Sequence, residues 1–418
     1  MSAETKTGNS TAVSAPGRMF FASCIALIAT AIIFAVRGDI EPDLKTAFNV
    51  THEQMGWVFL GAFWGFTVAM LIGGPLCDVV GMRAIFVLAF LGQVIGTALM
   101  VFANGVVMLA VSMWVLGLGN GFVEAAANPL VATIYPDQKI KKLNHFHAWW
   151  PGGLVIGSLL AFGLTRAIGP HWHGWQGWQV KQSLVLIPAV IYAVILFRLK
   201  LPCTERVQSG VSTGQMFKEA LRPLFIIWFL CMWLTAATEL GPNQWIRTIM
   251  TKIAGQSGIL FLAWISLIML VGRLFAGPVV HKLSPIRMLI MSAVAAAIGL
   301  YAMGNVHSAG MAYLASFVFA VGVCYFWPTM LGVTSERFPA GGAFLLGLMG
   351  AAGMASAGFA QPLMGWLYDT YKEAGALTHM AILPVILIVV FGAIFIRDLA
   401  KGGYKIVRLG EAEGQAQK

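Results

Sequence analysis

The sequence has few charged side chains, and this scarcity limits the kinds of fold that it can form. Of its 418 residues, 11% are charged and 58% are hydrophobic, and the mean hydropathy is +0.79. A soluble domain of this length needs far more charge on its surface. Cysteine is also scarce, and the five thiols form no paired motif, so we expect neither a disulfide nor a metal site from them. The composition excludes most soluble folds and indicates a membrane protein.

Motifs of soluble enzymes are missing as well. The sequence contains no glycine-rich phosphate-binding loop, no ATP motif and no Ser/His/Asp pattern for nucleophilic catalysis. His171 and His173 lie in the segment GPHWHGWQGWQVKQ, whose three tryptophans favour an aromatic belt at a membrane interface over a metal site. We therefore expect no enzymatic activity, no metal and no cofactor other than a coupling proton.

Apolar runs of the roughly 20 residues that cross a bilayer recur along nearly the whole chain. We place about twelve of them, which predicts an all-α membrane protein with two six-helix halves. The runs begin near Met19, Met55, Arg83, Val106, Leu143, Gln182, Pro223, Gly258, Ile286, Ala309, Ala343 and His379. No clear cleavage site closely follows the first run, so we interpret it as a retained span and not as a signal peptide.

Lysine and arginine are unevenly distributed between alternate loops. One set of loops, together with both tails, carries most of them, whereas the other set carries only Lys45, Arg166, Lys181, Arg247, Lys252 and Lys372. Basic residues near span ends stay on the cytoplasmic side of the membrane. We therefore expect both termini to be cytoplasmic. The net charge of +10 follows mostly from this asymmetry, so it predicts no nucleic-acid partner.

The longest polar interruption, KLPCTERVQSGVSTGQMFKEALRP, lies near the middle of the chain. An internal echo supports two related halves, because GGPLCDVVGMRAIF after the second run resembles AGPVVHKLSPIRMLI after the eighth. Duplicated halves are typical of secondary transporters, whose substrates bind near the midplane between them. We expect a cytoplasmic tail at 1–18, a six-helix bundle at 19–198, a cytoplasmic linker at 199–222, a second six-helix bundle at 223–397 and a cytoplasmic tail at 398–418.

Two motifs resemble a known family. Gly74, Asp78, Gly81 and Arg83 match the pattern Gly-x-x-x-Asp-x-x-Gly-x-Arg, which the major facilitator superfamily carries between its second and third helices. Within it, VEAAANPLV followed by LNHFHAWWPGG resembles the fucose:proton symporter family, with Glu-x-Ala-Ala-Asn-Pro on the fourth helix and Leu-Asn opening the fifth. The resemblance implies a conformational gate at the first motif and a proton-driven sugar importer of the inner membrane.

Glu124 is the strongest candidate for the proton carrier. A carboxylate that faces lipid costs several kcal/mol, so one inside a span normally faces a cavity, a partner or a proton path. Asn120, Glu124 and Asn128 recur every four residues, which predicts one helix face lining the central cavity. The two asparagines are then substrate-binding candidates. The alternative is that Glu124 ties two helices together through a buried pair.

The first span adds three candidates for proton coupling in the segment AVRGDIEPDLKTAF, namely Arg37, Asp39 and Glu41. The family has an acid a few residues before a proline on this helix. Asp39 is its nearest counterpart, although its spacing to Pro42 is one residue short. Arg37 stands where the family has an amide, and we expect it to pair with Asp39, Glu41 or Glu124. The alternative places these charges at the outer membrane surface.

Further substrate-binding candidates follow from polar and aromatic residues at span ends and beside prolines. His147 is favoured to bind sugar or to tune Glu124, because His145 and His147 point to opposite helix faces and cannot chelate one metal. In TELGPNQW a Gly-Pro step should break or bend the helix, which suits a gate. Arg273 we interpret as a helix-end anchor near the cytoplasmic side. The remaining candidates are Trp149, Trp150, Glu239, Asn243, Gln244, Trp245, Tyr325, Trp327 and Gln361, each with ordinary helix packing or surface exposure as its alternative.

These features predict a secondary active transporter, which couples a proton to the symport of a hexose or similar neutral sugar by alternating access. Arg37 motivates an alternative, the transport of a small organic anion such as a sugar acid. A third hypothesis is a membrane sensor built on a transporter fold. We expect a monomer in a bacterial inner membrane, whose partners are membrane lipid and a small-molecule substrate, most simply a sugar.

Overall fold

The computed structural model describes residues 15–255 and 258–409, apart from a few side chains inside helices. The first half contains eight α-helices, a short 3-10 helix and a two-stranded hairpin. These are α1 (Pro16–Phe48), α2 (His52–Val79), α3 (Met82–Val101), α4 (Val106–Ile134), η1 (Pro136–Gln138), α5 (Lys139–His147), α6 (Trp149–Ile168), β1 (His171–Trp172), β2 (Trp175–Gln176), α7 (Gly177–Ser183) and α8 (Leu186–Leu196). The sequence analysis did not predict the hairpin.

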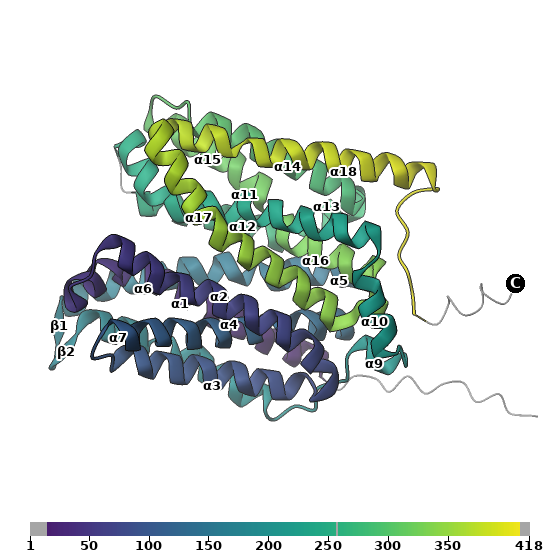
Figure 1. The fold of residues 1–418 in the computed structure, drawn as a ribbon, viewed down its shortest axis with the longest axis horizontal. Helices are drawn as coiled ribbons and strands as arrows, with labels where there is room; N and C mark the ends of the chain where they lie inside the picture. Colours follow the sequence, from purple (N-terminus) through teal and green to yellow (C-terminus); the bar gives the residue numbers. More distant parts are fainter. Residues whose placement is uncertain (1–14, 256–257, 410–418) are drawn as a thin grey trace, which may run out of the picture.

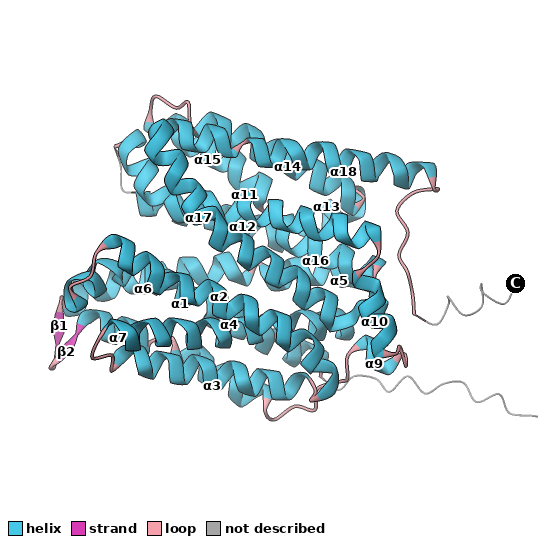
Figure 2. Cartoon of the chain, viewed as in Figure 1, coloured by secondary structure: helices cyan, strands magenta, loops and turns pink. Residues whose placement is uncertain are grey.

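Two short helices connect this half to the second, α9 (Glu205–Gln208) and α10 (Thr213–Ala220). The second half is helical throughout its described residues. Its elements are α11 (Pro223–Ala254), α12 (Gly258–Leu274), α13 (Ala276–Lys282), α14 (Pro285–Met303), α15 (Ala309–Val323), α16 (Phe326–Arg337), η2 (Pro339–Gly341), α17 (Gly342–Met380) and α18 (Ile382–Ala400). The helices and the single small hairpin are distinguished by colour in Figure 2.

The helix boundaries follow from local sequence signals. Thr51 caps α2, accepting a hydrogen bond from the backbone N–H of Gln54, whose side chain bonds back to Thr51. Pro16, Pro223 and Pro285 occupy the first turns of α1, α11 and α14, where the missing N–H costs no helical hydrogen bond. Each of these segments then continues as a long apolar helix.

The two halves lie side by side (Figure 1). The connecting helices α9 and α10 lie at one end of the molecule, which we call the linker end, and β1 and β2 lie at the opposite end, which we call the hairpin end. Between the halves α2 packs along α17, α6 packs on α12 and α5 packs on α16. A Cβ atom added to Gly74 would lie only 2.7 Å from the carbonyl oxygen of Ala343. Gly74 therefore allows α2 and α17 to touch near the linker end.

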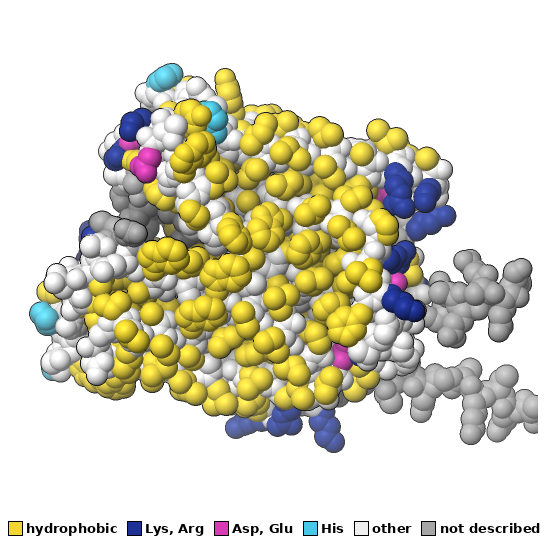
Figure 3. Space-filling model, viewed as in Figure 1, with side chains coloured by type: hydrophobic (Ala, Val, Ile, Leu, Met, Phe, Trp, Pro, Cys, Tyr) yellow, Lys and Arg dark blue, Asp and Glu magenta, His cyan; other side chains and the backbone are white. Residues whose placement is uncertain are grey.

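The surface has the character of a protein in a bilayer. Hydrophobic side chains cover the middle of the face in Figure 3, and Lys and Arg side chains lie at its edges. Among the described residues, ten helical stretches are long and apolar enough to cross a membrane. The last, Pro339–Ala400, is 62 residues long and is interrupted at Lys372, which adopts φ 63 and ψ −171. The chain is an integral multi-pass membrane protein.

Candidate functional site

A buried polar cluster joins α4 to α5. Asn128 Nδ2 donates to Glu124 Oε2 over 3.4 Å, and Asn128 Oδ1 lies 2.9 Å from His147 Nε2. The three residues are 3%, 0% and 2% exposed in the order Glu124, Asn128 and His147. Because the oxygen of Asn128 can only accept, the proton of a neutral His147 must sit on Nε2. The structure thus brings together three of the candidates from the sequence.

Asn120 does not belong to this cluster, so the expected three-residue stripe was wrong at that position. Its side-chain oxygen accepts a hydrogen bond from Gln93 Nε2 of α3 over 3.1 Å. Gln93 Oε1 in turn accepts from the hydroxyl of Tyr192 over 3.1 Å, so this network lies inside the first half. Each step of four residues turns a helix about 40° beyond a full turn, and two such steps separate Asn120 from Asn128. The two side chains therefore point in different directions, Asn120 toward α3 and Asn128 toward α5.

Arg273 lies in the last turn of α12, as the sequence predicted, and connects the cluster to the second half. It is 1% exposed on α12 and donates to the carbonyl oxygens of Cys324 over 2.6 Å and His147 over 3.0 Å. Its third partner is Glu239 Oε1 of α11 at 3.3 Å. His147 belongs to the first half, so Arg273 forms a hydrogen bond across the boundary between the halves.

Glu239 is buried, which rules out the water-exposed position that the sequence left open for it. It is 3% exposed, and its Oε2 atom has no hydrogen-bond partner among the described residues. The same holds for Asn243 Oδ1 and for Trp327 Nε1. Buried polar atoms normally find partners, so these three atoms are open to a ligand or to water.

Arg37 lies in a cage of aromatic rings on α1 and α2. Its guanidinium carbon lies 4.3 Å from the ring centre of Phe34, 5.1 Å from that of Phe63 and 5.5 Å from that of Phe59. The side chain of Trp150 extends the cage, because its ring centre is 5.0 Å from that of Phe34. Phe63 also approaches Gly358 of α17, so the cage reaches the boundary between the halves.

No carboxylate pairs with Arg37 in the part of the chain that the structure describes, and the expected partnership with Asp39, Glu41 or Glu124 was wrong. Asp39 Oδ2 binds Lys181 Nζ at 2.6 Å instead. Arg37 is only 5% exposed, so its alternative position at the outer surface was also wrong. A buried guanidinium therefore keeps its hydrogen-bond donors unused by described residues.

The aromatic candidates Trp245, Tyr325 and Trp149 make contacts between helices. Trp245 Nε1 donates to Gln361 Oε1 over 3.2 Å, and this bond connects α11 to α17 within the second half. Tyr325 donates to the carbonyl oxygen of Gly272 over 2.9 Å, which ties α16 to α12. Trp149 is half-buried and packs against the hydrophobic cores.

The Gly-Pro step of α11 does not interrupt the helix, which runs unbroken through Pro242 to Ala254. The side chain of Gln244 lies outside the described residues. Glu41 is half-buried on α1, one helical turn beyond Arg37.

The expected gate motif lies at the linker end. Gly81 adopts φ 82 before α3, a conformation that favours glycine. Arg83 donates to the carbonyl oxygen of Phe197 over 2.7 Å. Asp78 Oδ2 binds Arg206 Nε of α9 at 2.7 Å, and its other oxygen accepts from the hydroxyl of Thr204. These linker partners could not be predicted from local sequence patterns, because they are far from Asp78 along the chain.

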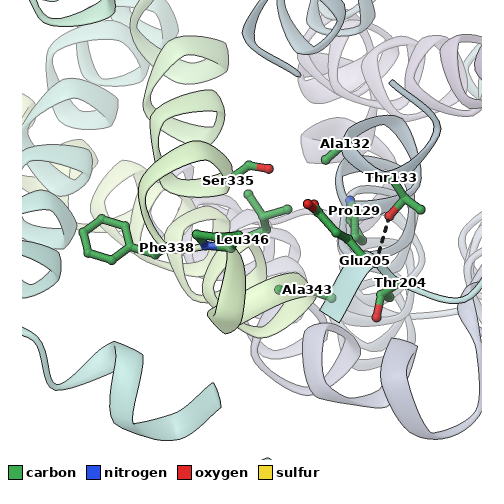
Figure 4. Close-up of a pocket in the computed structure, with 11 residues that line it drawn as sticks. Pro129, Ala132, Thr133, Thr204, Glu205, Ser335, Phe338, Ala343 and Leu346 are labelled. Carbon is green, nitrogen blue, oxygen red and sulfur yellow. Dashed lines mark hydrogen bonds between the residues drawn. The ribbon is translucent and has the colours of Figure 1, made fainter. Parts of the chain in front are cut away.

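Helix α9 lies between the halves beside a small cavity (Figure 4). On one side the backbone N–H of Glu205 donates to Thr133 Oγ1 of α4 over 3.3 Å. On the other side the cavity is lined by Ser335 and Leu346 of the second half. Lys139 binds Glu205 at 2.6 Å and also reaches the carbonyl oxygen of Ser335 at 3.4 Å. Contacts between the halves therefore seal the linker end.

Comparison with known proteins agrees with this architecture. The sequence profile of the Major Facilitator Superfamily matches residues 19–343. A gentisate transporter of Corynebacterium glutamicum is 23% identical over 276 residues, which span 63% of this chain and only 61% of that relative. A cis,cis-muconate transport protein of Acinetobacter baylyi is 24% identical over 344 residues, which span 74% of this chain and 78% of that protein.

A solved structure of the E. coli fucose:proton symporter has the same fold, with a TM-score of 0.75 over 90% of this chain and 98% of that one. The two sequences are 14% identical, so the likeness concerns the fold alone. The fold and the sequence profile are those of a transporter and not of an enzyme. They confirm the resemblance of the Gly74–Arg83 motif, and the chain belongs to the Major Facilitator Superfamily.

Proposed function

We propose that this chain is a proton-coupled symporter of a small organic anion. The observation that carries the proposal is Arg37, which is buried, faces three phenylalanine rings and pairs with no described carboxylate. A buried charge without a counter-charge is costly in a membrane, and cation–π contacts offset only part of that cost. The planar fork of a guanidinium suits a carboxylate, which it can bind through two parallel hydrogen bonds.

Glu124 is the best candidate for the coupling proton. Asp39 is engaged by Lys181 at 2.6 Å and Glu239 by Arg273 at 3.3 Å, whereas Glu124 has no ion-pair partner among the described residues. A carboxyl group whose neighbours are the uncharged side chains of Asn128 and Trp327 can gain and lose a proton without breaking a salt bridge. One proton that moves with a monovalent anion carries no net charge. Uptake should therefore follow the pH gradient and not the membrane potential.

A neutral hexose is the second candidate substrate. The observation that favours it is the supply of uncharged hydrogen-bonding groups around the boundary, which include Asn128, His147 and the unpartnered atoms of Asn243 and Trp327. Sugar hydroxyls need both donors and acceptors in dry surroundings. Such a substrate would leave Arg37 without a counter-charge, so we rank it below an organic anion.

Two bacterial relatives support the anion. The matched proteins of C. glutamicum and A. baylyi are a gentisate transporter and a cis,cis-muconate transport protein, and both of these substrates are carboxylic acids. We propose for this chain a bacterial inner membrane, twelve spans and cytoplasmic termini. The interruption at Lys372 would divide the longest apolar stretch into two spans, and Leu260–Leu274 would supply one more. With its linker end sealed, the transporter would be open or occluded toward the outside.

Transport by the purified protein in proteoliposomes tests the proposal. Labelled gentisate, cis,cis-muconate, galactonate and glucose are supplied outside vesicles with an alkaline lumen, with and without an imposed membrane potential. We expect at least one carboxylate to accumulate, and uptake of the monovalent anions gentisate and galactonate should respond little to the potential. Accumulation of glucose alone would favour the second candidate. Accumulation that follows a sodium gradient, in vesicles without a pH gradient, would remove the proton from the mechanism.

A further inference from the structure

We propose that the first half carries a binding site for the headgroup of an anionic phospholipid. The site is a surface groove between α1 and the end of α8 at the linker end. Its wall is formed by Arg18, Phe21, Val194, Ile195, Arg198 and Leu199. It lies apart from the boundary between the halves, so this inference does not depend on the identity of the transported substrate.

The groove has an unbalanced positive charge. Arg18 lies in the first turn of α1, and Arg198 follows the end of α8, so the two guanidinium groups come from different helices. Both side chains are exposed, and neither pairs with a carboxylate in residues 15–255 or 258–409. Arg222, at the same end of the molecule, binds Glu219 at 2.8 Å instead. The groove thus offers one anion two cations that no described carboxylate neutralises.

The charged and the apolar residues of the groove lie at different levels along the helices. Phe21 follows Arg18 by three residues on α1. Val194 lies in the last turn of α8, and Arg198 lies two residues beyond the end of that helix, where its backbone N–H donates to the carbonyl oxygen of Ile195 over 3.3 Å. Residues three or four apart lie on one helix face, separated by about 5 Å along the axis. Since α1 begins where α8 ends, each arginine lies one turn nearer the linker end than its apolar partner. Phe21 is 56% exposed and Val194 is 46% exposed.

This layering distinguishes a lipid from a soluble anion. A phosphate group at the level of Arg18 and Arg198 would place the attached acyl chains along Phe21 and Val194. A soluble phosphate would gain only the charge contacts, and the exposed apolar residues would remain unused. Basic residues at span ends also set topology, but that role requires neither a shared groove nor aligned apolar residues. The geometry therefore points to a phospholipid whose headgroup has a net negative charge.

Native mass spectrometry of the full chain in detergent tests this site. Phosphatidylglycerol and phosphatidylcholine with the same acyl chains are titrated separately, and we expect the first phosphatidylglycerol to bind more tightly. The double variant Arg18→Gln/Arg198→Gln should weaken that binding about tenfold or more, because both basic side chains that attract the anionic headgroup are lost. Arg397→Gln, at the exposed end of α18, is the matched control and should bind as the wild type does.

Two further measurements keep the proposal falsifiable. Arg18→Lys/Arg198→Lys should retain a preference for phosphatidylglycerol, which separates loss of charge from loss of folding. Soluble glycerol phosphate should not compete at concentrations similar to those of the lipid. Equal binding of the two lipids, unchanged binding by the double glutamine variant, or effective competition by glycerol phosphate would each overturn the lipid site.

Discussion

Two buried arginines, Arg37 of the first half and Arg273 of the second, have opposite kinds of surroundings. In the second half, Arg273 is 1% exposed and donates to two backbone carbonyl oxygens and to Glu239. In the first half, Arg37 is 5% exposed and is surrounded by phenylalanine rings, with no hydrogen bond to a described residue. The protein uses the donors of one arginine and leaves those of the other free.

The difference separates a structural charge from a binding charge. A buried arginine that donates to groups on several helices contributes to holding those helices together, and removing it leaves its partners unsatisfied. A buried arginine held only by ring faces keeps its N–H edge free for a ligand. Substitutions at Arg37 should therefore damage transport and spare the fold, whereas substitutions at Arg273 should damage the fold.

Arg37→Gln should have the largest effect on transport. Loss of a buried, charge-assisted pair with the substrate costs roughly 4 kcal/mol, which is about a thousandfold in affinity. Uptake of the transported anion in proteoliposomes should fall to background. Arg37→Lys keeps the charge but loses the fork geometry, so it should retain a small fraction of the uptake. Normal anion uptake by Arg37→Gln would show that the aromatic cage is only a packing device.

Glu124→Gln should abolish accumulation against a gradient, because an amide preserves hydrogen bonding to Asn128 but cannot carry a proton. Exchange of labelled for unlabelled substrate across the vesicle membrane should persist, since exchange needs no net proton movement. Both assays use the same vesicles, with Asp39→Asn as the comparison. Wild-type accumulation in Glu124→Gln would refute its role as proton carrier.

Arg273→Met should lower stability more than Arg37→Gln does. It leaves the carboxylate of Glu239 buried without a counter-charge, which costs roughly 3 kcal/mol. The apparent melting temperature in detergent, followed by intrinsic fluorescence, measures this loss. The double variant Arg273→Met/Glu239→Gln removes both charges and should recover part of the melting temperature. If Arg37→Gln melts at a lower temperature than Arg273→Met, the assignment of Arg273 as the structural charge and of Arg37 as the binding charge is wrong.

The smallest effects should come from the uncharged groups at the boundary. Asn128→Ala and Asn243→Ala should each weaken substrate binding by roughly 1 kcal/mol, about fivefold, through lost hydrogen bonds. Asn120→Ala is the matched control, because Asn120 bonds to Gln93 inside the first half. Isothermal titration of the substrate found in the uptake panel measures all three. A larger loss for Asn120→Ala than for Asn128→Ala would contradict the position of the site.

The fold was largely predictable, because spans, loop charges and the Gly74–Arg83 motif are local properties of the sequence. The grouping of Glu124 with Asn128 was predictable for the same reason, since one helical turn separates them. The misplacement of Asn120 came from extending a four-residue period over two turns. The partners of Asp39 and Arg273, and two of the three phenylalanine rings around Arg37, are on other helices, and sequence spacing within one helix cannot reveal them.

The position of helix α9 has a practical consequence for spectroscopy. Cys203 lies one residue before Thr204, which bonds to Asp78 of the expected gate motif, and the side chain of Cys203 is exposed. The other cysteines, Cys24, Cys77, Cys231 and Cys324, are buried. A thiol-reactive fluorophore should therefore label the native protein selectively beside its gate. The unmodified sequence already contains an attachment point from which movement of the linker could be followed during turnover.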